Sequence, residues 1–508
     1  MLAVAGELPQ GPPPDPRIPG SPGVSRSRLP GTAAPGTMEV MDTGPGEAVA
    51  PLPARTAGAT QATGTSRATR ASKATKATKA TKASTAAKAS KATREASTPT
   101  TRTAAPSPRR DGREPGPGRT SWGGPRHRAL YSRRALQADL SWPPLARLGR
   151  WIFSHPGPVL GLTGARQPVE VDGRVLNRGT QALLELARRY EAATGGGGDD
   201  PVFDPEAMRL QLTWMARAAM PVRTDVHVTG RVVPGPSGAP AVPVRVYRRF
   251  GTALGAEGRR PPAIVYFHGG GWVTGGLDSH DASCRLLAVA SGCMVVSVGY
   301  RLAPEDPHPA AVDDALAAYA WVCHHAAELG YAEGQVGVMG DSAGGNLAAV
   351  VARETRSVPA GTADVPPPVA QGLVYPALDA RLDSPAMENL GDGFFLTRRS
   401  MEFFRACYLV DESQWTDPRV SPLLADDHDG VAPALVVTAG FDPLRDDGAG
   451  YAEALRRAGV DVEYRCYDDQ VHGFMGMGVL PDSLALATEV GDAMGRLMRR
   501  VARPAPGG

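Results

Sequence analysis

The chain has 508 residues, of which 42 % are hydrophobic and 21 % charged, a composition typical of a globular protein of about two or three domains. The net charge of +3 hides an asymmetry, because residues 1–150 hold 24 Lys and Arg against 9 Asp and Glu, which leaves −12 on the other 358 residues. The acidic majority of the chain is therefore a poor nucleic-acid binder, and the lack of an apolar run of about 18 residues excludes an evident membrane span.

Residues 1–125 are expected to be a disordered, low-complexity basic tail, because they contain few large apolar side chains to offset the entropy of ordering. All six lysines lie between Lys73 and Lys91, in and after the repeat "SKATKATKATKAS". A nucleic-acid tether is one interpretation. No aromatic residues interleave with the basic ones, which favours a solvated tail or an upstream start codon read too early. The first residues lack the basic region of a signal peptide, so we expect a cytoplasmic protein.

Residues 126–220 are expected to form an N-terminal helical cap region. The stretch "LARLGRWIFSHPGPVLGL", residues 145–162, mixes apolar and basic side chains. Such a mixture is compatible with a helix lying on a membrane surface, but a helix packed on the rest of the protein is the preferred prediction.

Two further helices are predicted before the first strands. Residues 180–193 should form a helix with three leucines on one side, namely Leu183, Leu184 and Leu186. Residues 204–220 should form an amphipathic helix that begins with an Asp cap followed by Pro at the first helical position.

Residues 221–508 are expected to be one domain, in which strands alternate with helices. The expected strands are residues 225–233, 242–250, 263–272, 293–301, 335–340, 370–376, 433–444 and 460–469. The expected helices are residues 312–330, 346–354, 449–459 and 483–502. This alternation predicts an α/β fold with a mostly parallel central sheet and helices on both faces, interrupted by a helical insertion near residues 380–422.

One turn in this domain combines features that do not favour stability. In "GVMGDSAGGNLAAVVAR" a serine stands between glycines, directly after an apolar strand and before an alanine-rich helix. Gly-x-Ser-x-Gly in a sharp strand-to-helix turn raises the serine above the sheet edge, and the helix N–H groups favour negative charge there. The pattern alone is weak, but the strand before it and the helix after it favour Ser342 as a nucleophile.

A serine nucleophile needs a base and a group that stabilises an oxyanion, and the chain offers candidates for both. In "FHGGGW" three glycines follow a buried strand, so their N–H groups can line a site together with the amide of Ala343. The acid and base follow the serine on this fold, which points to Asp442 and His472 at the ends of separate strands. His268 is expected to be structural. Asp446 and Asp447 are expected to cap the following helix.

The motifs "HGGGW", "YRLAPEDPHPAAVDDA", "GDSAGGN", "DPLRDDG" and "VHGF" together resemble the hormone-sensitive-lipase-like family of α/β-hydrolases, in particular its bacterial carboxylesterases. The resemblance runs from about residue 171 to 500. It implies an α/β-hydrolase fold in which Ser342 is the nucleophile, His472 the base and Asp442 the acid. It also implies an oxyanion hole, formed by Gly270, Gly271 and Ala343.

The resemblance implies further roles and two departures. Three residues of "YRLAPE" would buttress the site, namely Tyr300, Arg301 and Glu305. Asp447 stands where the family more often has Glu, and His308 stands where an aromatic side chain is common. The helices before Pro221 and the insertion after Asp379 would form a cap that shapes the acyl pocket.

The expected activity is hydrolysis of short- to medium-chain acyl esters through an acyl-enzyme, with no metal or cofactor. The five cysteines have no metal-binding spacing and are expected to be buried thiols in a reducing compartment. A small-molecule ester is the expected partner, without specific nucleic acid or a membrane span, and a homodimer stays open. Two rival hypotheses are a non-catalytic binding protein of the same fold, as in plant gibberellin receptors, and cleavage of an amide, a lactone or an acetylated small molecule.

Overall fold

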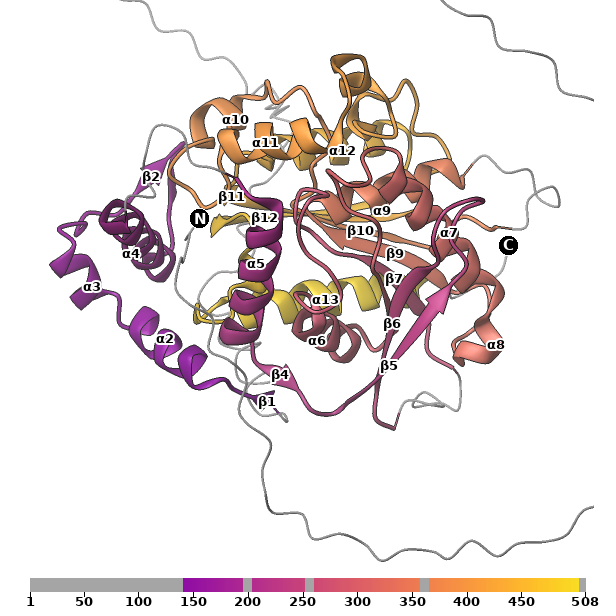
Figure 1. The fold of residues 1–508 in the computed structure, drawn as a ribbon, viewed down its shortest axis with the longest axis horizontal. Coiled ribbons are helices and arrows are strands. Elements are labelled where there is room, and N and C mark those ends of the chain that lie inside the picture. Colours follow the sequence, from indigo (N-terminus) through magenta and orange to yellow (C-terminus); the bar gives the residue numbers. More distant parts are fainter. Residues whose placement is uncertain (1–139, 195–202, 252–259, 357–364, 502–508) are drawn as a thin grey trace, which may run out of the picture. The chain divides into compact units, whose positions relative to one another are not determined.

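The central sheet of the computed structural model lies within the described residues, which are 140–194, 203–251, 260–356 and 365–501 (Figure 1). Among them eight strands pair in the order β12-β11-β10-β9-β7-β8-β6-β5. These strands are β5 (Val226–Val233), β6 (Val242–Arg249), β7 (Ala263–Phe267), β8 (Met294–Val298), β9 (Val336–Asp341), β10 (Gln371–Val374), β11 (Ala434–Phe441) and β12 (Val462–Val471). The tail expected at residues 1–125 lies outside the described residues.

The sheet is mostly parallel, as predicted. From β8 through β7, β9, β10 and β11 to β12 every neighbouring pair is parallel, whereas β6 is antiparallel to both β8 and β5. Every residue of β7, β8 and β11 is buried, because these strands have helices on both faces and need apolar side chains in both directions. The edge strand β5 is partly exposed, but its burial does not alternate as its sequence predicted, since Val232 is 69 % exposed.

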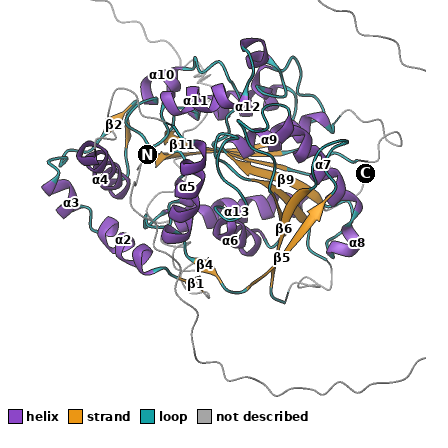
Figure 2. Cartoon of the chain, in the orientation of Figure 1, coloured by secondary structure: helices purple, strands orange, loops and turns teal. Residues whose placement is uncertain are grey.

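Helices cover both faces of the sheet, as Figure 2 shows. One face packs against α7 (Ala310–His324), α9 (Ala343–Glu354) and α12 (Arg445–Arg457). The other packs against α6 (Asp281–Ser291) and α13 (Ser483–Val501). Alternate strand residues divide between the two cores, so that Val265 belongs to the first and Ile264 to the second. This arrangement confirms the predicted layers.

Two details of these helices differ from the sequence-based prediction. Helix α6 was not predicted, because its short sequence "DASCRLLAVAS" follows a glycine-rich stretch and lacks a capping residue. Its N-cap His280 makes no side-chain capping bond, although Asp281 in the first turn favours a helix start. The helix predicted over 312–330 is interrupted at His325, after which the short α8 (Ala326–Leu329) begins.

The N-terminal helices also differ in part from the prediction. The helix predicted over 145–162 is two helices, α2 (Pro144–Ser154) and α3 (Gly157–Leu162), because Pro156 cannot continue the first one. Next comes α4 (Arg178–Thr194). Its Leu186 is 40 % exposed, so the prediction that Leu186 belongs to the apolar side of this helix is wrong. Helix α5 (Pro205–Ala219) begins as predicted, with the Asp204 carboxylate accepting the N–H groups of residues 206 and 207.

Short elements complete the described chain. Strand β1 (Leu140–Ser141) pairs with β4 (Val222–Arg223), and β2 (Glu170–Val171) pairs with β3 (Arg174–Val175). The segment of residues 379–422, called the insertion below, contains α10 (Pro385–Leu390), α11 (Arg398–Tyr408) and η1 (Glu412–Thr416), and η2 (Pro422–Leu424) begins at its last residue. A last turn, η3 (Phe474–Gly476), follows β12. Among the described residues, no helix has both the length and the apolarity needed to cross a bilayer.

Candidate active site

The turn between β9 and α9 holds Ser342 in a backbone conformation that residues other than glycine rarely adopt, with φ of 56° and ψ of −122°. Both glycines of the motif are required by close backbone contacts. A Cβ at Gly340 would lie 2.2 Å from the Gly344 carbonyl oxygen, and one at Gly344 would lie 2.0 Å from the Phe267 carbonyl oxygen. The entropic cost of these glycines is therefore explained by a turn that brings β9, α9 and the end of β7 into contact.

Three side chains from distant parts of the chain form one hydrogen-bonded row. The His472 Nε2 lies 3.0 Å from the Ser342 Oγ, and the His472 Nδ1 lies 2.8 Å from the Asp442 Oδ2. Asp442 follows β11 and His472 follows β12, so each lies at the carboxyl end of a parallel strand, as predicted. Asp442 is fully buried, and its second oxygen accepts the N–H of Leu444 at 2.9 Å, which fixes the carboxylate in place.

The glycine loop follows β7 and lies beside the serine turn, because Phe267 of β7 pairs with Gly340 of β9. Gly270 has φ of 125° and Gly271 has φ of 62°, so both occupy conformations that favour glycine. A Cβ at Gly271 would lie 2.3 Å from the ring of Phe404 in the insertion. Ala343 is the first residue of α9. Sequence reasoning therefore selected three backbone positions that lie at the same edge of the sheet.

Asp341, directly before the nucleophile candidate, joins the serine turn to the glycine loop. Its Oδ1 accepts the Gly269 N–H at 3.0 Å and the Tyr266 hydroxyl at 2.6 Å. Burial alone would raise the pKa of Asp341, but the neighbouring His280 and the Tyr266 hydrogen bond hold it below its usual range. Sequence reasoning missed this role; the aspartate in "GDSAGG" was the available signal.

His268 is structural, as predicted. It is fully buried, and its ring stacks on Tyr300 with centroids 4.2 Å apart. Burial lowers the pKa of His268 to about 3, so the imidazole is neutral at ordinary pH. The Tyr300 hydroxyl donates to the His268 carbonyl oxygen at 2.6 Å and so supports the start of the glycine loop.

The other two "YRLAPE" residues act at longer range. Arg301 forms an ion pair with the buried Asp314 of α7, with an N···O distance of 2.8 Å. Glu305 pairs with Arg209 of α5 at 2.6 Å, and the same guanidinium donates to the carbonyl oxygen of Val273 at 2.8 Å. The contacts of Arg209 hold α5 against the residues that follow the glycine loop.

The insertion closes the space beside the glycine loop. The rings of Trp272 and Tyr408 stack with centroids 4.4 Å apart and planes 1° apart. Next to them is a narrow cavity of about 20 Å³, lined mainly by apolar side chains that include Trp272, Met401, Leu409 and Val420. The space on this side of the site is therefore small in the structure.

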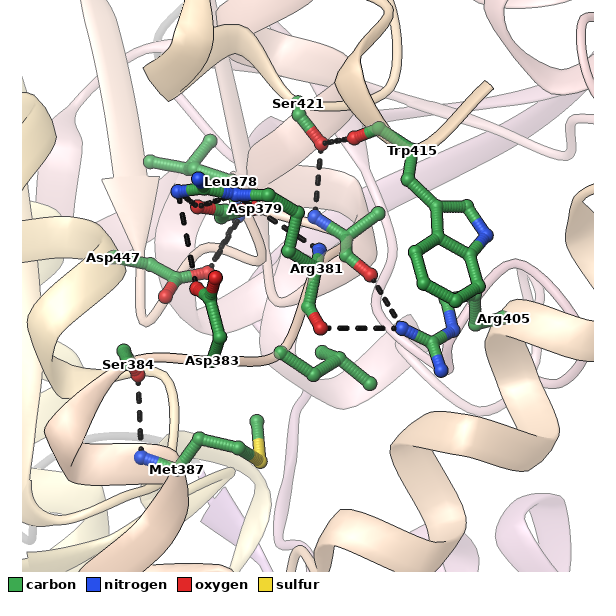
Figure 3. Close-up of polar contacts among 12 residues, drawn as sticks. Leu378, Asp379, Arg381, Asp383, Ser384, Met387, Arg405, Trp415, Ser421 and Asp447 are labelled. Atoms are coloured by element: carbon green, nitrogen blue, oxygen red, sulfur yellow. Dashed lines mark hydrogen bonds and ion pairs between the residues drawn. The ribbon is translucent and has the colours of Figure 1, made fainter. Parts of the chain in front are cut away.

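Polar contacts anchor the insertion to the fold (Figure 3). Arg405 of α11 donates to the Ala380 carbonyl oxygen at 2.8 Å and lies 3.8 Å from the Trp415 ring centroid. The Ser421 hydroxyl accepts the Ala380 N–H at 2.8 Å and donates to the Trp415 carbonyl oxygen at 2.6 Å. These contacts tie the middle and the end of the insertion to its beginning at residue 380.

The prediction that Asp446 and Asp447 cap α12 is wrong. The N-cap is Leu444, and the two carboxylates bind backbone N–H groups of the β10–α10 segment instead. Asp447 Oδ2 accepts the N–H groups of Leu378 at 3.0 Å and Asp379 at 3.1 Å (Figure 3). Asp446 accepts the N–H of Ala386 at 2.8 Å. Burial raises the pKa of Asp447 well above its usual range.

Another cavity lies away from the serine. It has a volume of about 370 Å³, and its charged side chains include Arg217, Arg245, Arg285 and Asp278, of which Arg245 and Asp278 form an ion pair at 2.8 Å. None of the predicted site residues lines it. No group of three or more His, Cys, Asp or Glu in the described part of the chain is arranged to hold a metal ion. Cys284 and Cys293 are buried thiols, as predicted, and the remaining three cysteines are partly exposed.

Comparisons with known proteins agree with this geometry. Residues 264–476 match the model of the α/β hydrolase fold family. The chain is 42 % identical to the carboxylic ester hydrolase LipN of Mycobacterium tuberculosis over 66 % of this chain and 86 % of LipN. It is 40 % identical to an ethyl acetate hydrolase of Pseudomonas putida, over 47 % of this chain and 72 % of that one.

Solved structures give the same result. An ester hydrolase from the Lake Arreo metagenome, complexed with a derivative of bipyridine phosphonate, matches with a TM-score of 0.57 and 37 % identity, over 62 % of this chain and 97 % of that one. A thermostable esterase of Pseudomonas putida matches with a TM-score of 0.56 and 33 % identity, over 63 % and 96 %.

Proposed function

Because this chain belongs to the hormone-sensitive-lipase-like family of α/β-hydrolases and is a carboxylic ester hydrolase, we propose that Ser342, His472 and Asp442 are its catalytic triad. The observation that carries the proposal is the row of two hydrogen bonds, 3.0 Å from serine to histidine and 2.8 Å from histidine to aspartate. Both distances lie within the reach that proton transfer requires.

In the acylation step, His472 Nε2 takes the Ser342 proton while Oγ attacks the ester carbonyl carbon. Asp442 accepts the hydrogen bond of His472 Nδ1, so the unprotonated nitrogen faces the serine. The carboxylate also stabilises the imidazolium that forms. His472 then protonates the departing alcohol, and the acyl group stays on Ser342 as an ester.

The amides of Gly270, Gly271 and Ala343 are proposed to hold the oxyanion. Their support is positional, since the glycine loop and the start of α9 adjoin the serine turn at the same sheet edge. An oxyanion stabilised by fixed backbone donors is worth about 10²- to 10³-fold in kcat per donor. In the second step, water activated by His472 attacks the acyl-enzyme and releases the acid.

The proposed substrates are small-molecule esters with short to medium acyl chains. Support comes from the 40 % identity to an ethyl acetate hydrolase, whose named substrate has a short acyl chain. Amides, lactones and acetylated small molecules use the same parts and are distinguished only by a substrate profile.

The test is a series of p-nitrophenyl esters of increasing acyl length with the Ser342→Ala variant and a matched control, Ser154→Ala, an exposed serine of α2. We expect Ser342→Ala to lose about 10⁴- to 10⁶-fold in kcat while the control is unchanged. A phosphonate ester with a p-nitrophenol leaving group should release p-nitrophenol and add the mass of its phosphonyl group to the control enzyme and not to Ser342→Ala. Unchanged hydrolysis or unchanged labelling in Ser342→Ala contradicts the assignment.

A further inference from the structure

One residue at the carboxyl edge of the sheet has no role in the proposed mechanism. The proposed triad follows the ends of β9, β11 and β12, and β10 lies between β9 and β11 in the sheet. The residue that follows β10 is Tyr375. Because parallel strands end at the same edge of a sheet, Tyr375 lies at the edge where the triad residues lie, and it is buried there, with 2 % exposure.

The backbone of Tyr375 has an unusual conformation. Its φ is 36°, in the left-handed region that bulky residues rarely adopt. Such a conformation is unfavourable and persists only where the surrounding contacts hold it, which occurs most often at functional sites. Filling the core does not require it, since Leu373 and Val374 of β10 are fully buried in ordinary strand conformation. The strain at Tyr375 therefore points to a functional constraint.

The backbone on either side of Tyr375 holds the nucleophile candidate. The Ser342 N–H donates to the Val374 carbonyl oxygen at 2.8 Å, and the Ala377 N–H donates to the Ser342 carbonyl oxygen at 3.4 Å. The Tyr375 N–H itself donates to the Val437 carbonyl oxygen of β11 at 2.6 Å. These bonds fix the position of Tyr375 relative to both the serine turn and β11.

The side chain of Tyr375 contacts the turn that carries His472. The two rings have centroids 4.7 Å apart and planes inclined at 56°. The Tyr375 ring also meets Phe474 edge to face, with centroids 5.5 Å apart. Burial raises the pKa of the Tyr375 phenol well above its usual range, and a hydrogen bond with the Met475 backbone acts in the opposite direction. Tyr375 therefore contacts His472 together with two residues that follow it.

The hydrogen bond to Asp442 does not by itself orient the His472 ring. It restrains one atom, Nδ1, at 2.8 Å from the carboxylate, and leaves the ring able to tilt about that point. A tilt moves Nε2, on the other side of the ring, away from the Ser342 Oγ that lies 3.0 Å from it. Proton transfer needs this distance, and a displacement of about 1 Å can cost about 100-fold in rate. A second contact on the imidazole ring, such as that of Tyr375, removes this freedom.

We propose that Tyr375 is a positioning residue, whose ring holds the imidazole of His472 so that Nε2 faces the Ser342 Oγ. The inference rests on the proposed function, because it assigns Tyr375 a role that acts through His472. Asp442 selects the tautomer of the imidazole, whereas Tyr375 restrains the tilt of its ring. The phenol takes no part in proton transfer, so the reaction requires the ring of Tyr375 and not its hydroxyl.

The test compares kcat and KM for a p-nitrophenyl ester among variants of the full chain. Tyr375→Leu removes the ring, Tyr375→Met fills more of the same volume without a flat face, and Tyr375→Phe keeps the ring and loses the hydroxyl. The matched control is Tyr467→Leu, in a fully buried tyrosine of β12 that belongs to the same core. Within the described residues the Tyr467 ring also packs edge to face on Phe474, with centroids 5.3 Å apart, but not on His472.

We expect Tyr375→Leu and Tyr375→Met to lower kcat by about 100-fold and to change KM by less than about threefold, because only the orientation of the base is lost. Tyr375→Phe should keep kcat within about threefold of the normal chain. Tyr467→Leu should lower the melting temperature as much as Tyr375→Leu does but leave kcat within about threefold. A normal kcat in Tyr375→Met overturns the proposal, as does a loss in Tyr375→Phe or Tyr467→Leu as large as in Tyr375→Leu.

A second comparison tests whether Tyr375 acts through His472. In a His472→Ala background, Tyr375→Met should change the residual kcat by less than about threefold, because the ring has no base left to orient. A further loss of about 100-fold in that background overturns the proposal. The Ser342→Ala variant distinguishes the two proposals. If it keeps normal activity, the triad is wrong and this inference fails with it, whereas a normal kcat in Tyr375→Met beside an inactive Ser342→Ala refutes the role of Tyr375 alone.

Discussion

The buried carboxyl of Asp447 offers a sharp test of how the candidate site is held together. Asp447→Ala removes the acceptor of two backbone N–H groups, those of Leu378 and Asp379. Asp447→Asn keeps an oxygen in the same place but cannot ionise. Comparing the two variants separates the hydrogen bonds from the charge.

The structure sets the size of each effect. Two buried donors without an acceptor cost about 1–3 kcal/mol each, so Asp447→Ala should lose about 2–6 kcal/mol of unfolding free energy. Burial raises the pKa of Asp447 well above its usual range, so the folded protein binds a proton that the unfolded chain releases. The stability from this group is fully present below the unfolded pKa of about 3.9 and is lost as pH rises through the folded pKa.

Asp447→Asn removes that pH dependence. Relative to the normal chain, the Asn variant should gain stability as pH rises from 5 to 8, by up to about 1.4 kcal/mol per pH unit until the folded pKa is passed. Urea unfolding at several pH values measures both effects, with Asp446→Ala as the neighbouring control that frees one N–H group, that of Ala386. If Asp447→Asn is as unstable as Asp447→Ala, or its stability relative to the normal chain does not change with pH, the reasoning is refuted.

Three further predictions concern the reaction itself. Gly271→Ala should lower kcat by about 100-fold or more, because its Cβ would lie 2.3 Å from the Phe404 ring. The double variant with Phe404→Ala should recover only part of this loss, because a φ of 62° still disfavours alanine at position 271. Steady-state kinetics of both variants test this prediction. Asp442→Asn should lower kcat by about 10⁴-fold, because the amide favours the wrong His472 tautomer, and a loss under tenfold argues against its role. Asp341→Ala should lower kcat more than it changes KM, because the glycine loop loses its anchor; an unchanged kcat contradicts this.

The strands and the main helices were predictable because burial on two faces demands continuous apolar runs, and β7, β8 and β11 consist of such runs. Helix α6 was not, because its one acidic residue in the first turn, Asp281, is a weak signal without a capping side chain at His280, and the helix is stabilised by packing on α13. Leu186 was predicted to share one apolar side with Leu183 and Leu184, yet the buried positions of α4 include Gln181 and Ala182, which contact the preceding loop and helices.

The three side chains of the hydrogen-bonded row, Ser342, Asp442 and His472, could be selected from the sequence because each follows a strand in a turn of defined residue type. The contacts of Asp341 and Asp447 could not be predicted, since each joins the carboxylate to a backbone N–H about 70 residues away. A local pattern shows that an acid is present near a helix start. It does not show which distant loop has an N–H group without an acceptor. For Asp447 the sequence indicated the start of its own helix, α12, whereas the carboxylate binds the N–H groups of Leu378 and Asp379.

These carboxylates suggest why the edge of the sheet near Ser342 is acidic. Loops at the carboxyl ends of parallel strands contain N–H groups that neither sheet nor helix can satisfy, and burying them without acceptors is costly. Asp341 accepts one from the glycine loop, Asp442 one from the turn that follows it, and Asp447 two from the β10–α10 segment. Each acid therefore fixes a different loop: Asp341 the glycine loop, Asp442 the turn that follows it, and Asp447 the start of the insertion. On this reasoning Asp442 is distinguished from the other two by the single contact that they lack, its hydrogen bond to His472.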